Sequence, residues 1–184
     1  MHTPLCGHAV GQPDEYARKA VELGLKEIGF SDHAPMVKFA DMPGVAMKFE
    51  ELPLYHRMIE EVREKYKDRI VIRIGIEADF IPGCEDKTRA ILDAYPYDYV
   101  IGSVHFIGDW AFDHPDKRAE WDNRDIDEVY RQYYRLLRES ARAGMFNTIA
   151  HADLVKKFGH RAKTDMIDEL RKNAEVFQEC GVAV

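Results

Sequence analysis

This sequence has fewer basic than acidic residues, and it lacks features that mark several common protein classes. Lysine and arginine together number 26 against 33 aspartate and glutamate residues, giving a formal net charge of −7. This balance argues against binding of nucleic acid or an anionic membrane by bulk electrostatics. No stretch approaches the roughly 18 apolar residues of a membrane span, and no signal peptide is recognisable. We therefore expect a cytoplasmic protein whose partners include neither nucleic acid nor membrane.

Cysteine is also scarce. Cys6, Cys84 and Cys180 are odd in number, far apart and in no CxxC pair, which indicates a reducing compartment rather than a disulfide framework. Cys6 lies two residues before His8 and could therefore be a metal ligand. A small buried thiol is the simpler interpretation.

What the sequence does contain is an alternation of helical and strand patterns without linkers or low-complexity segments, over a length of 184 residues that suits one domain. The pattern predicts helices over 13–24, 49–66, 85–95, 125–144 and 164–181, and strands over 27–33, 69–80, 97–106 and 146–154, with the edges of two more at the first and last residues. Such alternation predicts an α/β fold with a mainly parallel sheet. A closed eight-stranded barrel typically needs about 250 residues, so we expect an open sheet or part of a barrel.

Ionisable side chains follow one predicted strand after another. Asp32 and His33 end the first strand, while Glu77, His105 and His151 stand at the ends of the next three. In parallel α/β architectures the carboxyl ends of the strands converge on one face, where active sites are built. A single histidine in such a place would usually be a hydrogen-bonded core residue, but four successive strands ending this way predict a site.

Two more histidines stand near the start of the chain. If His2 and His8 come from the loop after an initial strand, five histidines and at least one carboxylate point into a single cavity. Because so many imidazoles are costly to desolvate without a ligand, we expect them to bind metal, with zinc, iron or manganese as the candidates. The remaining histidines are expected to be solvated or structural: His56, His114 and His160.

Five short motifs follow one another along the chain: "HTPLCGHA", "GFSDHAP", "GIEADF", "GSVHF" and "HADLVKKFGH". In this order they resemble the successive motifs of the PHP (polymerase and histidinol phosphatase) superfamily, and in detail those of its histidinol-phosphate phosphatases. The resemblance implies a single PHP-type domain over 1–184, folded as a partial, distorted β/α barrel of the family's seven-stranded type. It implies hydrolysis of L-histidinol phosphate to L-histidinol and phosphate in histidine biosynthesis, with up to three divalent metals (Zn, Fe or Mn) as cofactors.

The resemblance also implies a set of metal ligands: His2, His8, His33, Glu77, His105 and His151. Glu77 would bridge two metals, with His105 and His151 completing the second. His8 and His33 would bind the third. The residues on which catalysis is expected to depend are Glu77, His105 and Asp32.

Other residues are implied as partners of the ligands or of the substrate. Asp32 and Asp153 would fix imidazole tautomers, as carboxylates near metal sites commonly do. Arg161 is expected to bind the substrate phosphate because its planar guanidinium suits bidentate contact, with Lys157 as second choice. Both cations could instead be solvated surface residues.

The sequence departs from the family pattern at both ends. The family motif has a further histidine two residues before the one that matches His2, and a late Asp-x-His element that lies beyond residue 184. We therefore expect the domain to be incomplete at its first strand and its last strands, with fewer than three metals bound. Two alternatives stay open: another PHP phosphoesterase acting on a nucleotide or phosphopeptide, or an inactive, truncated metal-binding remnant.

Overall fold

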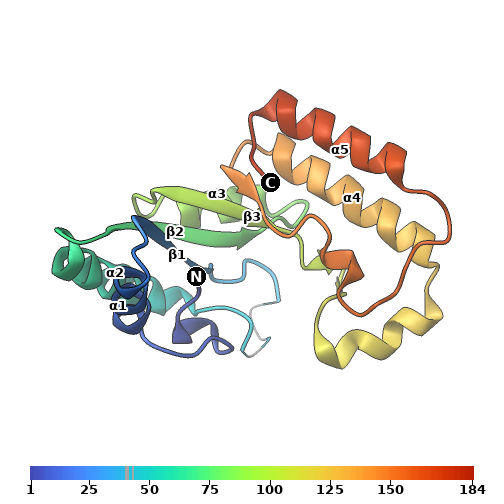
Figure 1. Cartoon of the computed structure of the whole chain (residues 1–184). Helices are drawn as coiled ribbons and strands as arrows, with labels where there is room; N and C mark the ends of the chain where they lie inside the picture. Colours follow the sequence, from blue (N-terminus) through green and yellow to red (C-terminus); the bar gives the residue numbers. More distant parts are fainter. Residues whose placement is uncertain (40–41, 43) are drawn as a thin grey trace. The chain divides into compact units, whose positions relative to one another are not determined.

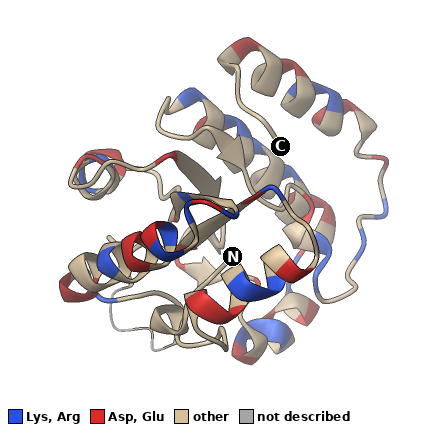
Figure 2. Ribbon diagram, turned by 60° about the vertical axis from the view of Figure 1, so that its left-hand side comes forward, with Lys and Arg blue, Asp and Glu red and all other residues tan. Residues whose placement is uncertain are grey.

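The computed structural model of the chain describes residues 1–39, 42 and 44–184, which form two compact units (Figure 1). Unit 1 comprises Met1–Ala78 and Asp86–Ile101, and unit 2 comprises Asp79–Glu85 and Gly102–Val184. Charged side chains are carried mainly by the helices and loops, whereas the strands are mostly uncharged (Figure 2). Among the described residues, none of the helices has the length and apolar character required to cross a membrane.

Unit 1 contains β1 (Glu27–His33), β2 (Val71–Asp79) as far as Ala78, and β3 (Tyr99–Ser103) as far as Ile101, in the sheet order β1-β2-β3. β1 and β2 are parallel, in a register that runs from Glu27 opposite Val71 to His33 opposite Glu77. The backbone of Met1 lies along the other edge of β1, where its carbonyl accepts a hydrogen bond from the amide of Ser31 at 2.8 Å. The strands predicted over 27–33 and 69–80 are confirmed.

Two helices of unit 1 pack against each other: α1 (Pro13–Glu22) and α2 (Leu52–Tyr66). The apolar stripe of α2 is buried at Tyr55, Ile59 and Val62 and half-buried at Leu54 and Met58. The helix predicted over 49–66 begins as a short 3-10 turn, and α2 proper starts at Leu52. α3 (Glu85–Leu92) ends three residues before its predicted limit.

A tyrosine ring crosses the sheet of unit 1 where two strands carry glycine. The Tyr99 side chain lies directly on the backbone of Gly29 in β1 and Gly75 in β2, and a Cβ at either position would overlap its ring. On the other face of β2, Ile72, Ile74 and Ile76 are buried. Since side chains alternate along a strand, Glu77 projects from the same face as Gly75 and lies one step closer to the strand's carboxyl end.

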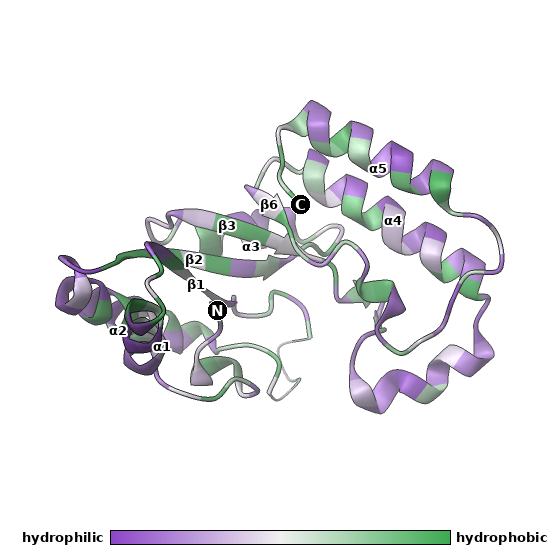
Figure 3. Ribbon diagram, in the orientation of Figure 1, coloured by the Kyte–Doolittle hydropathy of each residue, from purple (hydrophilic) through white to green (hydrophobic). Residues whose placement is uncertain are grey.

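Unit 2 is built around two long helices, α4 (Ile126–Arg142) and α5 (Ile167–Cys180), which pack on each other. Apolar and polar residues alternate along both (Figure 3). One face of α4 is buried at Val129, Tyr130, Tyr133, Leu136 and Leu137, while Ile126 at its start is only half-buried. The N-cap of α5 is Met166, and the carboxylate of Asp165 accepts a hydrogen bond from the Ile167 amide at 2.9 Å.

The strands of unit 2 are shorter than predicted. β6 (Thr148–Ile149) lies beside the end of β3, and the amide of Ala150 donates to the carbonyl of Gly102 at 2.9 Å. The strand predicted over 146–154 stops there because the chain turns at His151, whose φ is +28°, and enters a 3-10 turn at Leu154–Lys156. Thr148 of β6 also forms a parallel bridge with Ala183, so the strand edge predicted near the last residues does occur.

The polar stretch between β3 and α4 has more structure than the sequence predicts. It contains a small antiparallel hairpin of β4 (Phe106–Ile107) and β5 (Trp110–Ala111), followed by a 3-10 helix over Pro115–Asn123. Trp110 and Trp121 pack edge-on at 5.0 Å between ring centroids and are buried together. Two buried indole rings therefore anchor a segment whose overall composition indicates a solvated loop.

Candidate metal centre

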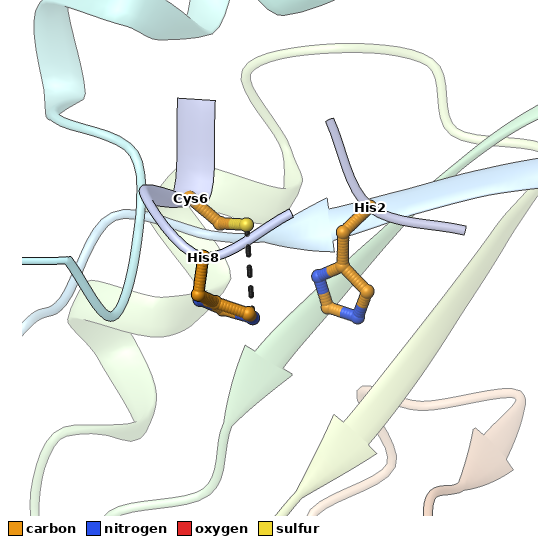
Figure 4. Close-up of side chains that lie close together, drawn as sticks. All are labelled: His2, Cys6 and His8. Carbon is orange, nitrogen blue, oxygen red and sulfur yellow. Dashed lines mark hydrogen bonds between the residues drawn. The ribbon is translucent and has the colours of Figure 1, made fainter. Parts of the chain in front are cut away.

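The first loop of unit 1 brings two histidines to one place. Residues Pro4–Cys6 form one turn of 3-10 helix, capped at its start by Thr3, whose hydroxyl accepts from the Leu5 amide at 3.3 Å. Gly7 ends the turn in the left-handed region at φ +81°, and a Cβ there would lie 2.7 Å from Cα of Gly44. Only glycine fits this turn, which reverses the chain so that His2 and His8 face the same space (Figure 4).

Three imidazole rings cluster in this part of unit 1. The ring centroids of His2 and His33 are 4.5 Å apart, those of His8 and His33 are 5.2 Å apart, and those of His2 and His8 are 5.5 Å apart. His33 comes from the end of β1, and its neighbour in register on β2 is Glu77. His33 and Glu77 thus lie side by side at the carboxyl ends of β1 and β2, with the rings of His2 and His8 next to that of His33.

The carboxylate of Asp32 forms hydrogen bonds with several residues of this cluster. It is fully buried and accepts hydrogen bonds from Nδ1 of His2 at 3.2 Å, the Thr3 amide at 3.0 Å, the His33 amide at 2.9 Å and the Thr3 hydroxyl. Burial raises the pKa of Asp32, but the hydrogen bonds from His2 and Thr3 outweigh it, so the pKa lies below its usual value. Asp32 is therefore ionised and holds the proton of His2 on Nδ1.

Glu77 supplies the second carboxylate. Its side chain is buried, with Oε2 3.4 Å from Nε2 of His2 and Oε1 3.9 Å from Nδ1 of His33. The hydrogen bonds with Asp32 and then Glu77 raise the pKa of His2 to about 9. In the metal-free chain His2 is thus positively charged at neutral pH, and a cation bound between these side chains would replace that charge.

The donor atoms fit a divalent metal. One ligand atom each from His2, His33 and Glu77 lie within 4.8 Å of one another, and the same holds for His2, Cys6 and His8. Nδ1 of His8 is 3.3 Å from the carbonyl oxygen of Gly44, so Nδ1 is the donor and Nε2 carries the lone pair. Metal-bound histidines commonly donate their other ring nitrogen to a carboxylate or carbonyl in this way.

The histidines predicted at the next two strand ends lie in unit 2. Nδ1 of His105 donates to Oδ1 of Asp79 at 2.8 Å, which leaves Nε2 as the nitrogen suited to a metal. The rings of His105 and His151 are 5.0 Å apart, and the carbonyl of His151 accepts from the Tyr133 hydroxyl at 2.7 Å. That these two histidines share an ion with Glu77 stays a prediction.

The two basic residues expected to bind the substrate phosphate, Arg161 and Lys157, also lie in unit 2. The exposed Arg161 guanidinium donates to two backbone carbonyls of its own loop at 3.0 and 2.9 Å, so its position is fixed. The amine of Lys157 pairs with Asp113 at 3.0 Å. Asp153, expected to orient an imidazole, is exposed, and its carboxylate lies 3.7 Å from the amine of Lys156.

Sequence reasoning missed three contributors to these clusters. Asp79 follows Glu77 by two positions on β2, so the period of a strand could have drawn attention to it. Thr3 stands directly before a proline, which is typical of a helix N-cap. The carbonyl of Gly44 gives no signal in the sequence, because any residue carries a carbonyl and its approach to His8 depends on the path of a distant loop.

Comparison with known proteins assigns the family. The sequence pattern of the PHP domain matches residues 1–184, the whole chain. The chain belongs to the PHP family. Both the resemblance inferred from the five motifs and the α/β class with parallel strands alternating with helices are thereby confirmed.

Relatives of this PHP chain carry names that bear on its activity. It is 48% identical over 160 residues to a Deinococcus radiodurans protein named "Probable histidinol-phosphatase", an alignment that covers 87% of the chain and 61% of the relative. It is 34% identical over 178 residues to "Histidinol-phosphatase" of Bacillus subtilis, which covers 86% of the chain and 66% of the relative. The chain thus spans about two thirds or less of the length of these relatives.

A solved structure supports the PHP fold. The chain superposes on the histidinol phosphate phosphatase of Lactococcus lactis, solved in complex with Zn, L-histidinol and phosphate, with a TM-score of 0.79 and 23% identity. The match covers 99% of this chain and 69% of that structure. At this level of identity the likeness bears on the fold alone.

Proposed function

We propose that this chain is a metal-dependent phosphomonoester hydrolase that converts L-histidinol phosphate and water to L-histidinol and phosphate, a step of histidine biosynthesis. The observation that carries the proposal is the convergence of donor atoms from His2, His33 and Glu77 within 4.8 Å at the carboxyl ends of parallel strands. Membership of the PHP family and two relatives named histidinol-phosphatase support the substrate. The cytoplasmic location expected from the sequence stays a prediction.

The ligands we propose are the six expected from the resemblance: His2, His8, His33 and Glu77 in unit 1, and His105 and His151 in unit 2. Zinc is the first candidate because the Lactococcus lactis structure contains it, while iron and manganese suit the same nitrogen and oxygen donors. Divalent ions held there would act as Lewis acids, neutralising charge on the phosphoryl oxygens and making water a better nucleophile.

The side chains of unit 1 have distinct tasks in this proposal. Asp32 holds Nδ1 of His2, which presents Nε2 in a fixed orientation. Glu77 directs one carboxylate oxygen toward His2 and the other toward His33, an arrangement suited to bridging two cations. Its burial and negative charge make it the residue on which binding of positive ions should depend most strongly.

Unit 2 supplies the proposed contacts with the substrate phosphate. The guanidinium of Arg161 is held by backbone carbonyls and remains exposed, so its outward N–H groups can bind an oxyanion. Lys157 is the weaker candidate, since its amine is already paired with Asp113.

Together with Glu77, Asp32 and His105 complete the proposed set of residues essential for activity.

The test is phosphate release from L-histidinol phosphate by the purified chain, with Zn²⁺ or Mn²⁺ added. We expect hydrolysis that stops on addition of a chelator. Glu77→Gln should reduce both metal content and the rate by about 100-fold, because it removes a buried ligand charge. Glu64→Gln, at a side chain 73% exposed on α2, is the matched control and should behave like the parent chain.

A panel of other phosphomonoesters separates the remaining alternatives. Faster hydrolysis of a nucleotide or a phosphotyrosine peptide than of L-histidinol phosphate would transfer the proposal to another PHP phosphoesterase. Tight metal binding without hydrolysis of any of these esters would contradict enzymatic activity in this chain and favour a metal-binding remnant.

A further inference from the structure

The proposed hydrolysis assigns no role to Cys6. Its side chain is completely buried at the end of the 3-10 turn, with Sγ 3.1 Å from the carbonyl oxygen of Thr3 and 3.7 Å from Nε2 of His8. Figure 4 shows the thiol and both imidazoles turned toward one another. The other cysteines lie elsewhere, Cys84 half-buried and Cys180 exposed.

The separation of the two donor atoms agrees with shared coordination. Zinc binds thiolate sulfur at about 2.3 Å and histidine nitrogen at about 2.0–2.1 Å, so two such ligands of a tetrahedral ion are about 3.6 Å apart. Sγ of Cys6 and Nε2 of His8 are 3.7 Å apart before any ion is added. The Gly44 carbonyl fixes the proton of His8 on Nδ1, so the lone pair of Nε2 is directed to the side of the sulfur.

The sulfur of Cys6 lies close to the rest of the proposed metal centre. The ligand atoms of His2, His8 and Cys6 lie within 4.8 Å of one another. The chemistry of this set differs from that of an all-nitrogen and oxygen site, because thiolate selects zinc and similar soft ions while manganese and magnesium prefer oxygen. Sulfur would therefore bias the choice of metal.

We propose that Cys6 is a metal ligand and that its sulfur, beside Nε2 of His8, makes the ion held at the N-terminal loop of this centre selectively zinc. The inference rests on the metal-binding part of the proposed function and adds a thiolate ligand to it. On binding, the thiol proton of Cys6 passes to solvent and the sulfur forms a bond to the ion. The turn ended by Gly7 is what brings sulfur and nitrogen together, since it reverses the chain between His2 and His8.

Cobalt gives a direct spectroscopic test on the full chain. Co²⁺ adopts zinc sites, and a cobalt–thiolate bond produces a charge-transfer absorption in the near ultraviolet. We expect this absorption in the parent chain, in Cys84→Ser and in Cys180→Ser, and its loss in Cys6→Ser. Zinc affinity, measured by competition with a chromophoric chelator, should fall about 100-fold in Cys6→Ser, with a much smaller change for manganese.

A second measurement covers the case in which Cys6→Ser does not fold, as judged by circular dichroism. The double variant Cys84→Ser/Cys180→Ser leaves Cys6 as the single thiol, and Zn²⁺ should slow its reaction with a thiol reagent at least tenfold while Mn²⁺ has little effect. Equal protection by both ions, or cobalt binding without the near-ultraviolet absorption, would overturn the inference.

The two proposals fail independently. A chain that shows the cobalt–thiolate absorption but hydrolyses no phosphomonoester supports the Cys6 site and contradicts the hydrolase. A chain that hydrolyses L-histidinol phosphate while Cys6→Ser keeps the parent's preference for zinc over manganese contradicts the Cys6 site and leaves the hydrolase in place.

Discussion

At the scale of single residues, His56 differs from the histidines of the metal centre. Of the two alternatives expected for it, solvated or structural, the structure agrees with the second: only 7% of it is exposed, because Tyr95 stacks on its ring at 4.0 Å between centroids. Tyr97 covers it from another side at 4.9 Å. Within the described part of the chain, Nε2 of His56 and the hydroxyl of Tyr97 are buried without a hydrogen-bond partner.

This burial predicts a pH dependence of stability. Burial lowers the pKa of His56 below its ordinary value of 6.5, with Glu60 acting weakly in the opposite direction. The unfolded chain therefore takes up a proton more readily, and the contribution of His56 to stability, complete above pH 6.5, is lost as the pH falls below it. His56→Phe keeps the stack on Tyr95 and removes the titrating group.

We expect His56→Phe to lose less stability than the parent chain between pH 7.5 and pH 5.5, measured as the free energy of unfolding in urea. His114→Phe is the matched control for replacing a histidine by phenylalanine, since His114 is partly exposed and caps the 3-10 helix of unit 2, whereas Tyr95 belongs to unit 1. Identical pH dependence of the His56 variant and the parent would show that His56 does not titrate differently on unfolding.

At the scale of elements, the start of α4 depends on one carboxylate. Asp125 is the N-cap of this 17-residue helix, and Oδ1 accepts from the amides of Asp127 and Glu128 at 3.0 and 3.3 Å. It thereby satisfies two amides that the helix itself leaves unpaired, and its charge faces the positive end of the helix dipole.

Asp125→Ala should therefore lower the free energy of unfolding by about 1 kcal/mol. Urea denaturation measures this change, and Asp116→Ala, at a side chain 88% exposed, serves as the control with an expected change near zero. A loss no larger than that of the control would mean that water replaces the cap without cost.

The elements also show how far sequence reasoning reaches. Long amphipathic helices such as α2 and α4 were predictable because one face repeats apolar residues every three to four positions. β6 was overpredicted, since the apolar run around it does not reveal that the backbone turns at His151. The hairpin of β4 and β5 was missed because its two-residue strands are too short to show a period and depend on the packing of Trp110.

The candidate site likewise contains residues that the sequence could predict and partners that it could not. His2, His33 and Glu77 could be found from the sequence, because histidine and carboxylate at strand ends are rare without a function and the ends of parallel strands converge. Their partners were harder to find. The position of a backbone carbonyl such as that of Gly44, which selects the tautomer of His8, depends on tertiary contacts that leave no pattern in the chain.

At the scale of the whole molecule, bound metal should be part of the chain's stability. A ligand that binds only the folded state at 100 times its dissociation constant adds about 2.7 kcal/mol to the free energy of unfolding. For a chain of this length that corresponds to a shift of about 5–10 °C in the melting temperature. The unfolded chain has no preformed site, because its ligands come from positions as far apart as His2 and Glu77.

We therefore expect a chelator to lower the melting temperature of the metal-loaded chain by about 5–10 °C, as followed by circular dichroism. Zn²⁺ should restore it and Mg²⁺ should not, because nitrogen-rich donors bind Mg²⁺ poorly. Glu77→Gln should show little response to either treatment. A melting temperature unaffected by chelation would argue that these side chains hold no ion.

The packing of Tyr99 over Gly29 and Gly75 constrains the ways in which this sequence can diverge. Neither glycine can gain even a methyl group while the ring is present, and loss of the ring leaves a void over both strands. Substitutions at these sites are consequently contingent on one another: a smaller residue has to arise at Tyr99 before either strand can accept a side chain. Descendants of this chain would then record the order of their mutations, with the tyrosine changing first and the glycines following.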